Sequence, residues 1–136
     1  MDRRSLLSGG GVLLAAQLLP SQAGARARTS AITPDDGKFM QMAIDQAKEG
    51  DYPFGAVIVR GGRVLALGRN CSKRNSDPTA HAEMVAIRAF LNGHEPDDLK
   101  ETTLYSSGEP CVMCMGAIIW CGIKRLVFAA SIAQLS

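Results

Sequence analysis

The sequence has few cysteines, no excess of charge of one sign and no hydrophobic run long enough to span a membrane. Its 136 residues include four cysteines, too few for a small domain held together by disulfide bonds. When residues 1–27 are set aside, Lys and Arg fall from 15 to 12 and Asp and Glu from 13 to 12. This balance gives no support to the large basic face that nucleic-acid binding needs. A hydrophobic content of 46% and a charged content of 21% indicate one ordinary globular domain, and no repeat or low-complexity segment is present.

The first 30 residues have the pattern of a targeting segment. Arg3 and Arg4 are followed by an uncharged apolar run over residues 9–19, well short of the ~20 residues of a membrane-spanning helix. Small residues at 23–27 offer two overlapping cleavage sites. Because the paired arginines resemble a twin-arginine export signal, we expect residues 1–27 to be removed, leaving a periplasmic domain without a membrane span. The alternatives are an amphipathic or disordered N-terminal tail and a cytoplasmic location.

Beyond this segment, hydrophobic periodicity predicts alternating helices and strands. The expected helices are residues 31–50, 81–91 and 111–120, and the expected strands are 54–60, 63–68, 103–106 and 124–130. Two glycines at 61–62 indicate a hairpin turn, residues 70–79 a polar loop and residues 93–100 a charged surface link. The strand-helix-strand order at the end favours an α/β fold, in which helices pack on the faces of a mixed sheet.

Two short segments, residues 81–83 and 110–114, carry the candidate chemistry, and each opens a predicted helix. The free N–H groups of a helix N-terminus favour thiolate over thiol. Cys111 and Cys114 are three residues apart, so their sulfurs project from the same helix face. With the imidazole of His81 they make three ligands, and three protein ligands with an open fourth position are typical of a catalytic zinc ion. One such ion per chain can lower the pKa of a bound water towards ~7.

Glu83 follows the candidate ligand His81 by two residues, and we expect it to act as a base and not as a ligand. The pattern H-x-E followed by P-C-x-x-C is that of the zinc-dependent nucleobase deaminases. The chain therefore resembles the zinc-dependent cytidine and deoxycytidylate deaminase superfamily. Further segments look like its branch of guanine deaminases and tRNA adenosine deaminases. These segments are Pro53–Val57, Asp77–Glu83, Glu109–Cys111, Gly116–Ile118 and Trp120, and the resemblance runs from about Phe39 to Ala130.

The resemblance implies a fold and a set of roles. It implies a three-layer α/β/α cytidine-deaminase-like fold with a mixed sheet for the deaminase domain, residues 31–136. It implies that one Zn²⁺ is held by His81, Cys111 and Cys114, and that Glu83 carries a proton from the water to a ring nitrogen and then to the leaving amine. The substrate contacts that it implies are Asn70 at the base edge, Phe54 at the wall of the base pocket, and Ala82. The alternative for Asn70 is an ordinary turn residue.

The implied reaction is hydrolytic deamination of a small amino-purine base or nucleoside, with guanine as the first choice and no nucleic-acid partner. A homodimer is also implied. Deamination of tRNA adenosine and of cytosine or cytidine are alternatives; the export signal and the near-neutral charge weigh against tRNA. A periplasmic thiol-disulfide oxidoreductase that uses Cys111 and Cys114 is an alternative of another class, because C-x-x-C at a helix start is also thioredoxin-like. That alternative leaves residues 81–83 unexplained.

Three remaining residues are expected to have ordinary structural roles. We expect Cys121 to be buried packing, Cys71 to be a free or partly buried thiol, and His94 to lie on the surface. The sequence ends soon after the last predicted strand, whereas the resemblance implies a further helix, often a fifth strand, and residues that close over the substrate. We therefore expect a fold truncated after its fourth strand, with residues 126–130 on an uncovered edge.

Overall fold

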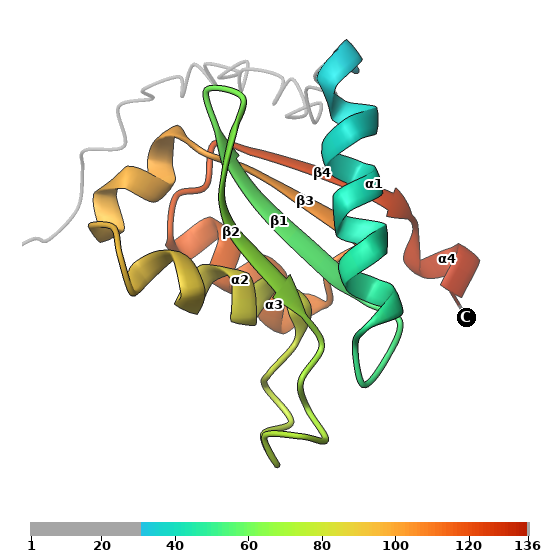
Figure 1. The fold of residues 1–136 in the computed structure, drawn as a ribbon. Coiled ribbons are helices and arrows are strands. Elements are labelled where there is room, and N and C mark those ends of the chain that lie inside the picture. Colours follow the sequence, from blue (N-terminus) through green and yellow to red (C-terminus); the bar gives the residue numbers. More distant parts are fainter. Residues whose placement is uncertain (1–30, 136) are drawn as a thin grey trace, which may run out of the picture. The chain divides into compact units, whose positions relative to one another are not determined.

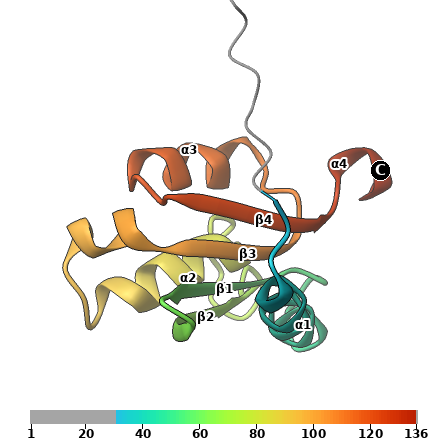
Figure 2. The same ribbon diagram turned by 90° about the horizontal axis from the view of Figure 1, so that it is seen from above.

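Four strands form one mixed sheet in the computed structural model, which describes residues 31–135 (Figure 1). The strands are β1 (Gly55–Arg60), β2 (Arg63–Arg69), β3 (Thr103–Gly108) and β4 (Arg125–Ala130). The helices are α1 (Pro34–Lys48), α2 (Ala82–Leu91), the 3₁₀ helix η1 (Pro96–Glu101), α3 (Val112–Trp120) and α4 (Ile132–Leu135). The sheet order is β2-β1-β3-β4, with β2 and β4 at the two edges (Figure 2). Strand β1 is antiparallel to both neighbours, whereas β4 is parallel to β3 because α3 connects them.

The two faces of the sheet are covered by different helices, which gives three layers. Strand β1 alternates between them: Ala56 and Ile58 pack with buried residues of α2 and α3, whereas Val57 and Val59 pack with buried residues of α1. This alternation follows from the two-residue period of a strand. Helix α1 and the pair α2 and α3 therefore lie on opposite faces (Figures 1 and 2). The expected α/β/α fold with a mixed sheet is confirmed.

Gly68 of β2 lets the start of α2 lie directly on the sheet. A Cβ atom at this position would lie 2.1 Å from the carbonyl oxygen of Ala82 and 2.6 Å from the backbone nitrogen of Ala86. Only a residue without a side chain permits so close an approach. The beginning of α2, which carries His81 just before it and Glu83 in its first turn, is therefore held in one place over the strand.

A buried carboxylate fastens α1 to β3 and β4. Asp36 is 3% exposed and accepts two hydrogen bonds from the Arg125 guanidinium, at 2.7 and 2.8 Å. It also accepts hydrogen bonds from the Tyr105 hydroxyl and from the backbone N–H of Thr33, both at 2.7 Å. The Arg125 guanidinium, helped by the other donors, holds the pKa of Asp36 well below its usual range. Burial, and then the neighbouring carboxylate, raise the pKa of Tyr105 to about 12.

The structure differs from the sequence expectations at three places. Residues 93–100, expected to be a surface link, overlap the 3₁₀ helix η1, whose Leu99 is buried in the core with residues of α2 and α3. A single apolar residue in a charged segment produces no periodic signal. His94 is half-buried and not a free surface residue, because its ring packs on Phe90 with the centroids 4.5 Å apart. The four-residue helix α4 follows β4 and was not predicted, whereas the expected truncation after the fourth strand stays a prediction.

Other expectations concern the cysteines, the sheet edge and the N-terminus. Cys121 is partly buried against the core, as expected, and Cys71 is a half-buried free thiol. Among the described strands, β4 pairs with β3 alone and forms an edge. No helix of residues 31–135 is long and apolar enough to cross a membrane. The export signal expected at residues 1–27 lies outside the described residues and stays a prediction.

Candidate metal centre and substrate pocket

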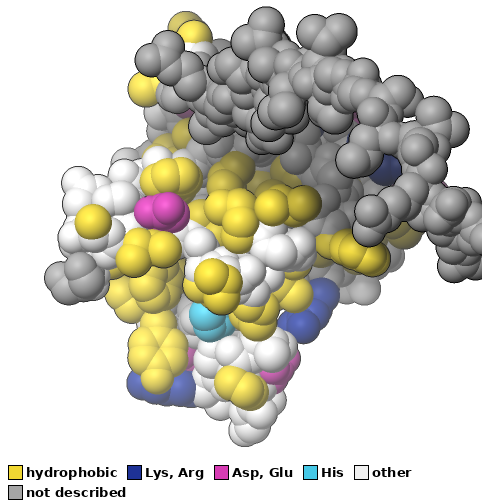
Figure 3. Space-filling view, turned by 180° about the vertical axis from the view of Figure 1, so that it is seen from behind, with side chains coloured by type: hydrophobic (Ala, Val, Ile, Leu, Met, Phe, Trp, Pro, Cys, Tyr) yellow, Lys and Arg dark blue, Asp and Glu magenta, His cyan; other side chains and the backbone are white. Residues whose placement is uncertain are grey.

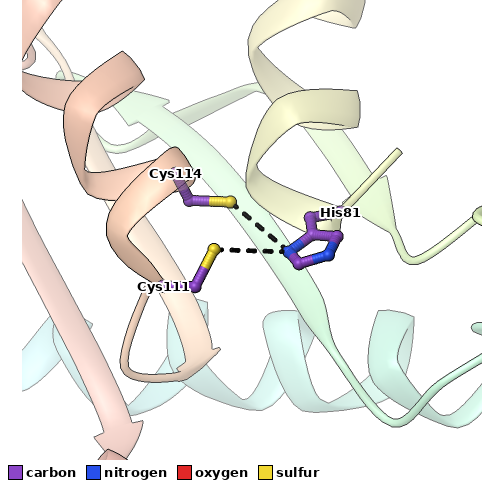
Figure 4. A group of neighbouring side chains, drawn as sticks. All are labelled: His81, Cys111 and Cys114. Carbon is purple, nitrogen blue, oxygen red and sulfur yellow. Dashed lines mark hydrogen bonds between the residues drawn. The ribbon is translucent and has the colours of Figure 1, made fainter. Parts of the chain in front are cut away.

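Three potential metal ligands converge from the starts of two helices. His81 is the residue immediately before α2, Cys111 is the residue immediately before α3, and Cys114 lies in the first turn of α3. The Nδ1 atom of His81 is 3.6 Å from the sulfur of Cys111 and 3.7 Å from the sulfur of Cys114. Figure 4 shows the two thiols and the imidazole pointing toward one another. All three ligand atoms lie within 4.8 Å of one another, so the group could hold a metal ion.

The spacing of these atoms fits a tetrahedral zinc ion. With Zn–S of about 2.3 Å and Zn–N of about 2.1 Å, a tetrahedral angle places sulfur and nitrogen about 3.6 Å apart. The observed separations of 3.6 and 3.7 Å match that value. Two thiolates and a neutral imidazole are also ligands that Zn²⁺ prefers, and their charges sum to zero with it. His81 and Cys111 both line a pocket, which leaves room for a fourth ligand on that side.

Cys114 shows why this site needs a cation. The residue is fully buried, and burial raises the pKa of its thiol well above the usual range; the nearby Glu83 carboxylate and Cys111 raise it further. The helix N-terminus at which Cys114 lies acts on this pKa in the opposite direction. Burial and like charge outweigh that effect at Cys114. A divalent ion would supply the positive charge that a buried thiolate requires.

Glu83 lies beside this group with its carboxylate almost enclosed. The residue is 5% exposed, yet it lines the same pocket as His81 and Cys111. Its Oε1 accepts a hydrogen bond of 2.8 Å from the hydroxyl of Ser106 on β3. The structure thus brings together the four residues that the sequence predicted for metal binding and proton transfer. No sequence pattern had indicated Ser106.

The pocket next to this group has a volume of about 550 Å³, within the usual range for small-ligand sites. Its lining combines aromatic and aliphatic side chains with a small number of polar ones. The lining residues are Tyr52, Phe54, Asn70, Ser72, Pro78, His81, Glu83, Glu109, Cys111, Ile132 and Leu135. No Lys or Arg is among these described lining residues. These lining residues therefore suit a neutral molecule better than an anionic one.

The three predicted substrate contacts have different positions relative to this pocket. Phe54 and Asn70 both line it. The side-chain oxygen of Asn70 accepts a hydrogen bond of 3.1 Å from the backbone N–H of Ser72, so this residue also forms the turn that was its alternative role. Ala82 is fully buried in the core and is not among the lining residues. A substrate contact by Ala82 would have to use its backbone, and it stays a prediction.

Comparison with known proteins identifies the family. Residues 33–130 match the cytidine and deoxycytidylate deaminase zinc-binding region. The chain belongs to this family. A guanine deaminase of Bacillus subtilis is 43% identical over 97 residues, which cover 68% of this chain and 62% of that protein. A tRNA-specific adenosine deaminase of Buchnera aphidicola is 46% identical over 107 residues, which cover 74% of this chain and 64% of that protein.

The solved structures agree with the sequence relatives. The crystal structure of guanine deaminase from Bacillus subtilis superposes with a TM-score of 0.66 and 40% identity, covering 73% of this chain and 66% of that chain. This member of the cytidine and deoxycytidylate deaminase family therefore spans 62% to 66% of the length of these relatives. The family is defined by a zinc-binding region, and the His-Cys-Cys group described above supplies suitable ligands for that metal.

Several pocket residues of this family member were not predicted from its sequence. Ile132 and Leu135 of α4 line the pocket, and the backbone N–H of Ile132 donates a 2.8 Å hydrogen bond to the carboxylate of Glu109. Glu109 belongs to the segment Glu109–Cys111, which contributes to the family resemblance, and this was the one feature of the sequence that pointed to it. Tyr52 precedes another such segment. For the aliphatic residues of α4 no pattern existed, because a four-residue helix has no periodicity to detect.

The alternative of a thiol-disulfide oxidoreductase finds no support in these observations. The sulfurs of Cys111 and Cys114 both lie next to an imidazole nitrogen, as expected of metal ligands. The family match covers the whole described sheet and includes both cysteines. The presence of His81 and Glu83, which the oxidoreductase alternative left unexplained, follows directly from a zinc-binding deaminase region.

Proposed function

We propose that the chain is a zinc-dependent hydrolytic deaminase that exchanges the amino group of a nucleobase for oxygen and releases ammonia. The observation that carries the proposal is the position of the Glu83 carboxylate, which shares one pocket with the ligand group of His81, Cys111 and Cys114. These three residues would hold the zinc ion, which supplies Lewis-acid activation of a water molecule at neutral pH. Every other part of the reaction falls to side chains of this chain.

Glu83 would move the protons. Deamination requires a base that accepts a proton from water and an acid that gives one to a ring nitrogen and then to the departing amine. One carboxylate can serve in both steps, since it becomes the acid after it has accepted the proton. At 5% exposure the carboxylate is largely shielded from bulk solvent while it still borders the pocket. The overall balance is one water consumed and one ammonia released.

Phe54 and Asn70 would hold the base. The aromatic ring of Phe54 offers a flat apolar surface for stacking. The oxygen of the Asn70 amide is used by Ser72, so the amide nitrogen is the group left to donate a hydrogen bond to a base edge. A neutral amide donor and an aromatic wall favour an uncharged heterocycle. We propose an amino-purine as the substrate, with guanine first, in line with the guanine deaminase relative.

A tRNA adenosine is the second candidate, and relatives of that class match the chain just as well. The tRNA-specific enzyme of Buchnera aphidicola is 46% identical, against 43% for the guanine deaminase. The identities therefore do not separate the two substrates. The absence of Lys and Arg from the described pocket lining favours the free base, because a nucleic acid would bring phosphates to the rim.

Ammonia release by the zinc-loaded full chain tests the proposal. The substrates would be guanine, adenine, cytosine, their nucleosides and an RNA hairpin with adenosine in its loop. We expect release from guanine, and we expect Glu83→Gln to keep its zinc and release none. Release of ammonia from the RNA hairpin alone would show that the substrate is a tRNA adenosine and not guanine. A zinc-loaded protein that is silent toward every substrate would contradict the proposed function.

Location and assembly are further proposals. We propose export to the periplasm, supported by the arginine pair and apolar run within residues 1–27. Fractionation of cells that make the full chain, with Arg3 and Arg4 replaced by Lys in a control, would test it. Equal distributions of the two proteins between the fractions would contradict it.

We also propose a homodimer, supported by exposed apolar side chains on α3, among them Ile119 at 71% and Trp120 at 90%. A monomeric mass by light scattering would contradict it. Figure 3 shows hydrophobic side chains gathered around a histidine on one face of the molecule.

A further inference from the structure

We propose that Ser106 is a positioning residue, whose hydroxyl holds the Glu83 carboxylate at the pocket. This inference rests on the proposed deaminase function, because the position of Glu83 matters for catalysis only if Glu83 moves protons. Its structural basis is the hydrogen bond of 2.8 Å from Ser106 Oγ to Glu83 Oε1, which joins the middle of β3 to the first turn of α2.

Because Ser106 is buried, its hydroxyl requires a hydrogen-bond partner within the protein. The residue is 0% exposed and, two positions after Leu104, points to the face of β3 that packs on α2 and α3. The nearby side chains of that layer, such as Ile58, are apolar. A hydroxyl in such a layer costs free energy unless it forms a hydrogen bond. The partner that compensates this cost is Glu83.

The surroundings of Glu83 show why it needs such a partner. In the part of the chain that the structure describes, no Lys or Arg forms an ion pair with its carboxylate. A Glu side chain has three rotatable bonds, and without a fixed contact it would sample several positions. One hydrogen bond to Oε1 restricts the carboxylate while leaving the residue in the pocket lining. A neutral donor achieves this without pairing the carboxylate with a charge.

The first test compares two substitutions of equal shape. Ser106→Val and Ser106→Thr add the same bulk, but only threonine keeps a hydroxyl. We expect the valine protein to lose about 10- to 100-fold in kcat with little change in KM, because a small misplacement of a reacting group can cost about 100-fold. We expect the threonine protein to stay close to the parent. Zinc content, measured for both, should remain at one equivalent.

The control for this comparison is Thr102→Val. Thr102 is also fully buried next to β3, but its hydroxyl donates to the carbonyl oxygen of Leu99, at 2.6 Å, and does not reach Glu83. Its loss should lower the unfolding midpoint and leave kcat unchanged. The inference is overturned if Ser106→Val keeps the parent kcat, or if Ser106→Thr falls as far as Ser106→Val.

A second test needs no activity and separates this inference from the proposed function. Urea unfolding of Ser106→Val, Glu83→Ala and the double variant measures whether the two side chains interact. We expect Ser106→Val to lower the unfolding midpoint in the parent, and to lower it less or even raise it when Glu83 is absent, since the hydroxyl then has no acceptor. Equal shifts in both backgrounds overturn the inference. If no ammonia is released but the effect of Ser106→Val on unfolding depends on Glu83, the proposed deaminase function is rejected while the interaction between Ser106 and Glu83 is confirmed.

Discussion

Glu83 and Asp36 are two carboxylates buried on opposite faces of the same sheet, and their surroundings differ. Asp36 accepts four hydrogen bonds, of which two come from the Arg125 guanidinium. The Glu83 carboxylate accepts a hydrogen bond from the neutral hydroxyl of Ser106 and lies close to the Cys114 thiol. Both are at most 5% exposed, so burial alone does not distinguish them.

The difference separates a structural carboxylate from one that is available for chemistry. The donors around Asp36 stabilise its ionised form so strongly that it keeps its charge through the ordinary pH range. Such a group cannot take part in proton transfer. No Lys or Arg of the described residues pairs with Glu83, which borders a pocket, and this arrangement suits the proton-carrying role that we propose for it. Changing one carboxylate at a time should therefore affect either turnover or stability, but not both.

The largest effect is expected from Glu83→Gln. The amide still accepts a hydrogen bond from Ser106, so folding and zinc content should be retained, but it cannot carry a proton. We expect ammonia release to fall by about 100-fold or more, the range typical of lost general acid-base catalysis. Steady-state ammonia assays and metal analysis would measure the two properties on one sample. Turnover near that of the parent would remove Glu83 from the mechanism.

Asp36→Asn should show the reverse behaviour. The amide group brings N–H donors toward a guanidinium that has only donors, which leaves the partly buried Arg125 without its counter-charge. We expect the free energy of unfolding to fall by about 3 kcal/mol, with kcat unchanged. Urea unfolding at pH 7 and the ammonia assay would measure both. A variant as stable as the parent would show that the cluster is dispensable.

The loss of stability at acidic pH gives a further test of the role of Asp36 as a structural carboxylate. Because the pKa of Asp36 is depressed in the folded state, the unfolded chain binds a proton first as the pH falls. The stabilisation is therefore present above pH ~5 and is lost on acidification below the usual aspartate pKa of about 3.9. The parent should lose more stability than Asp36→Asn between pH 5 and pH 3, roughly the window in which unfolded aspartates titrate. If the stability of the parent and of Asp36→Asn falls equally with pH over this range, the depressed pKa of Asp36 does not contribute to stability.

Gly68→Ala tests whether the position of α2 matters for the centre that contains Glu83. The added Cβ would lie 2.1 Å from the Ala82 carbonyl oxygen, so the helix start must move. We expect a loss of about 2 kcal/mol of stability and weaker zinc binding, since His81 moves with the helix. Urea unfolding and competition with a zinc chelator would measure the two losses. The matched control is Gly37→Ala in α1, where a Cβ meets nothing within 4 Å and should stabilise the helix.

The parts of the fold predicted from the sequence are those with a local signal. The short apolar, β-branched run that contains Ala56–Val59 and the i, i+4 spacing of Phe39, Ala43 and Ala47 predicted the strand and helix positions to within a few residues. The ligand group was predictable because His81 and the cysteine pair each stand at a helix start. Such features depend on neighbours in the sequence, so one chain is sufficient to see them.

The parts that were missed depend on contacts between distant residues. The cluster around Asp36 joins residues 89 positions apart, and the Ser106 to Glu83 hydrogen bond joins residues 23 apart. Neither serine nor aspartate has a pattern that announces such a partner. Leu99 and the short helix α4 were missed because they are too brief to show a period. The contribution of α4 to the pocket lining could be recognised only from the three-dimensional structure.

The smallest effect is expected at Tyr105, which donates one of the four hydrogen bonds to Asp36. Tyr105→Phe removes that bond but leaves Arg125 in place, so we expect a loss of about 1 kcal/mol at pH 7. The pKa of Tyr105 is raised to about 12, above the value near 10 of an unfolded tyrosine. Its contribution is thus complete below about pH 10 and is lost as the pH rises toward 12. The parent should therefore lose more stability than Tyr105→Phe across this alkaline range, as urea unfolding would measure. If both proteins lose stability equally there, the hydroxyl does not stabilise the Asp36 cluster, and the carboxylate is held by the guanidinium and the backbone alone.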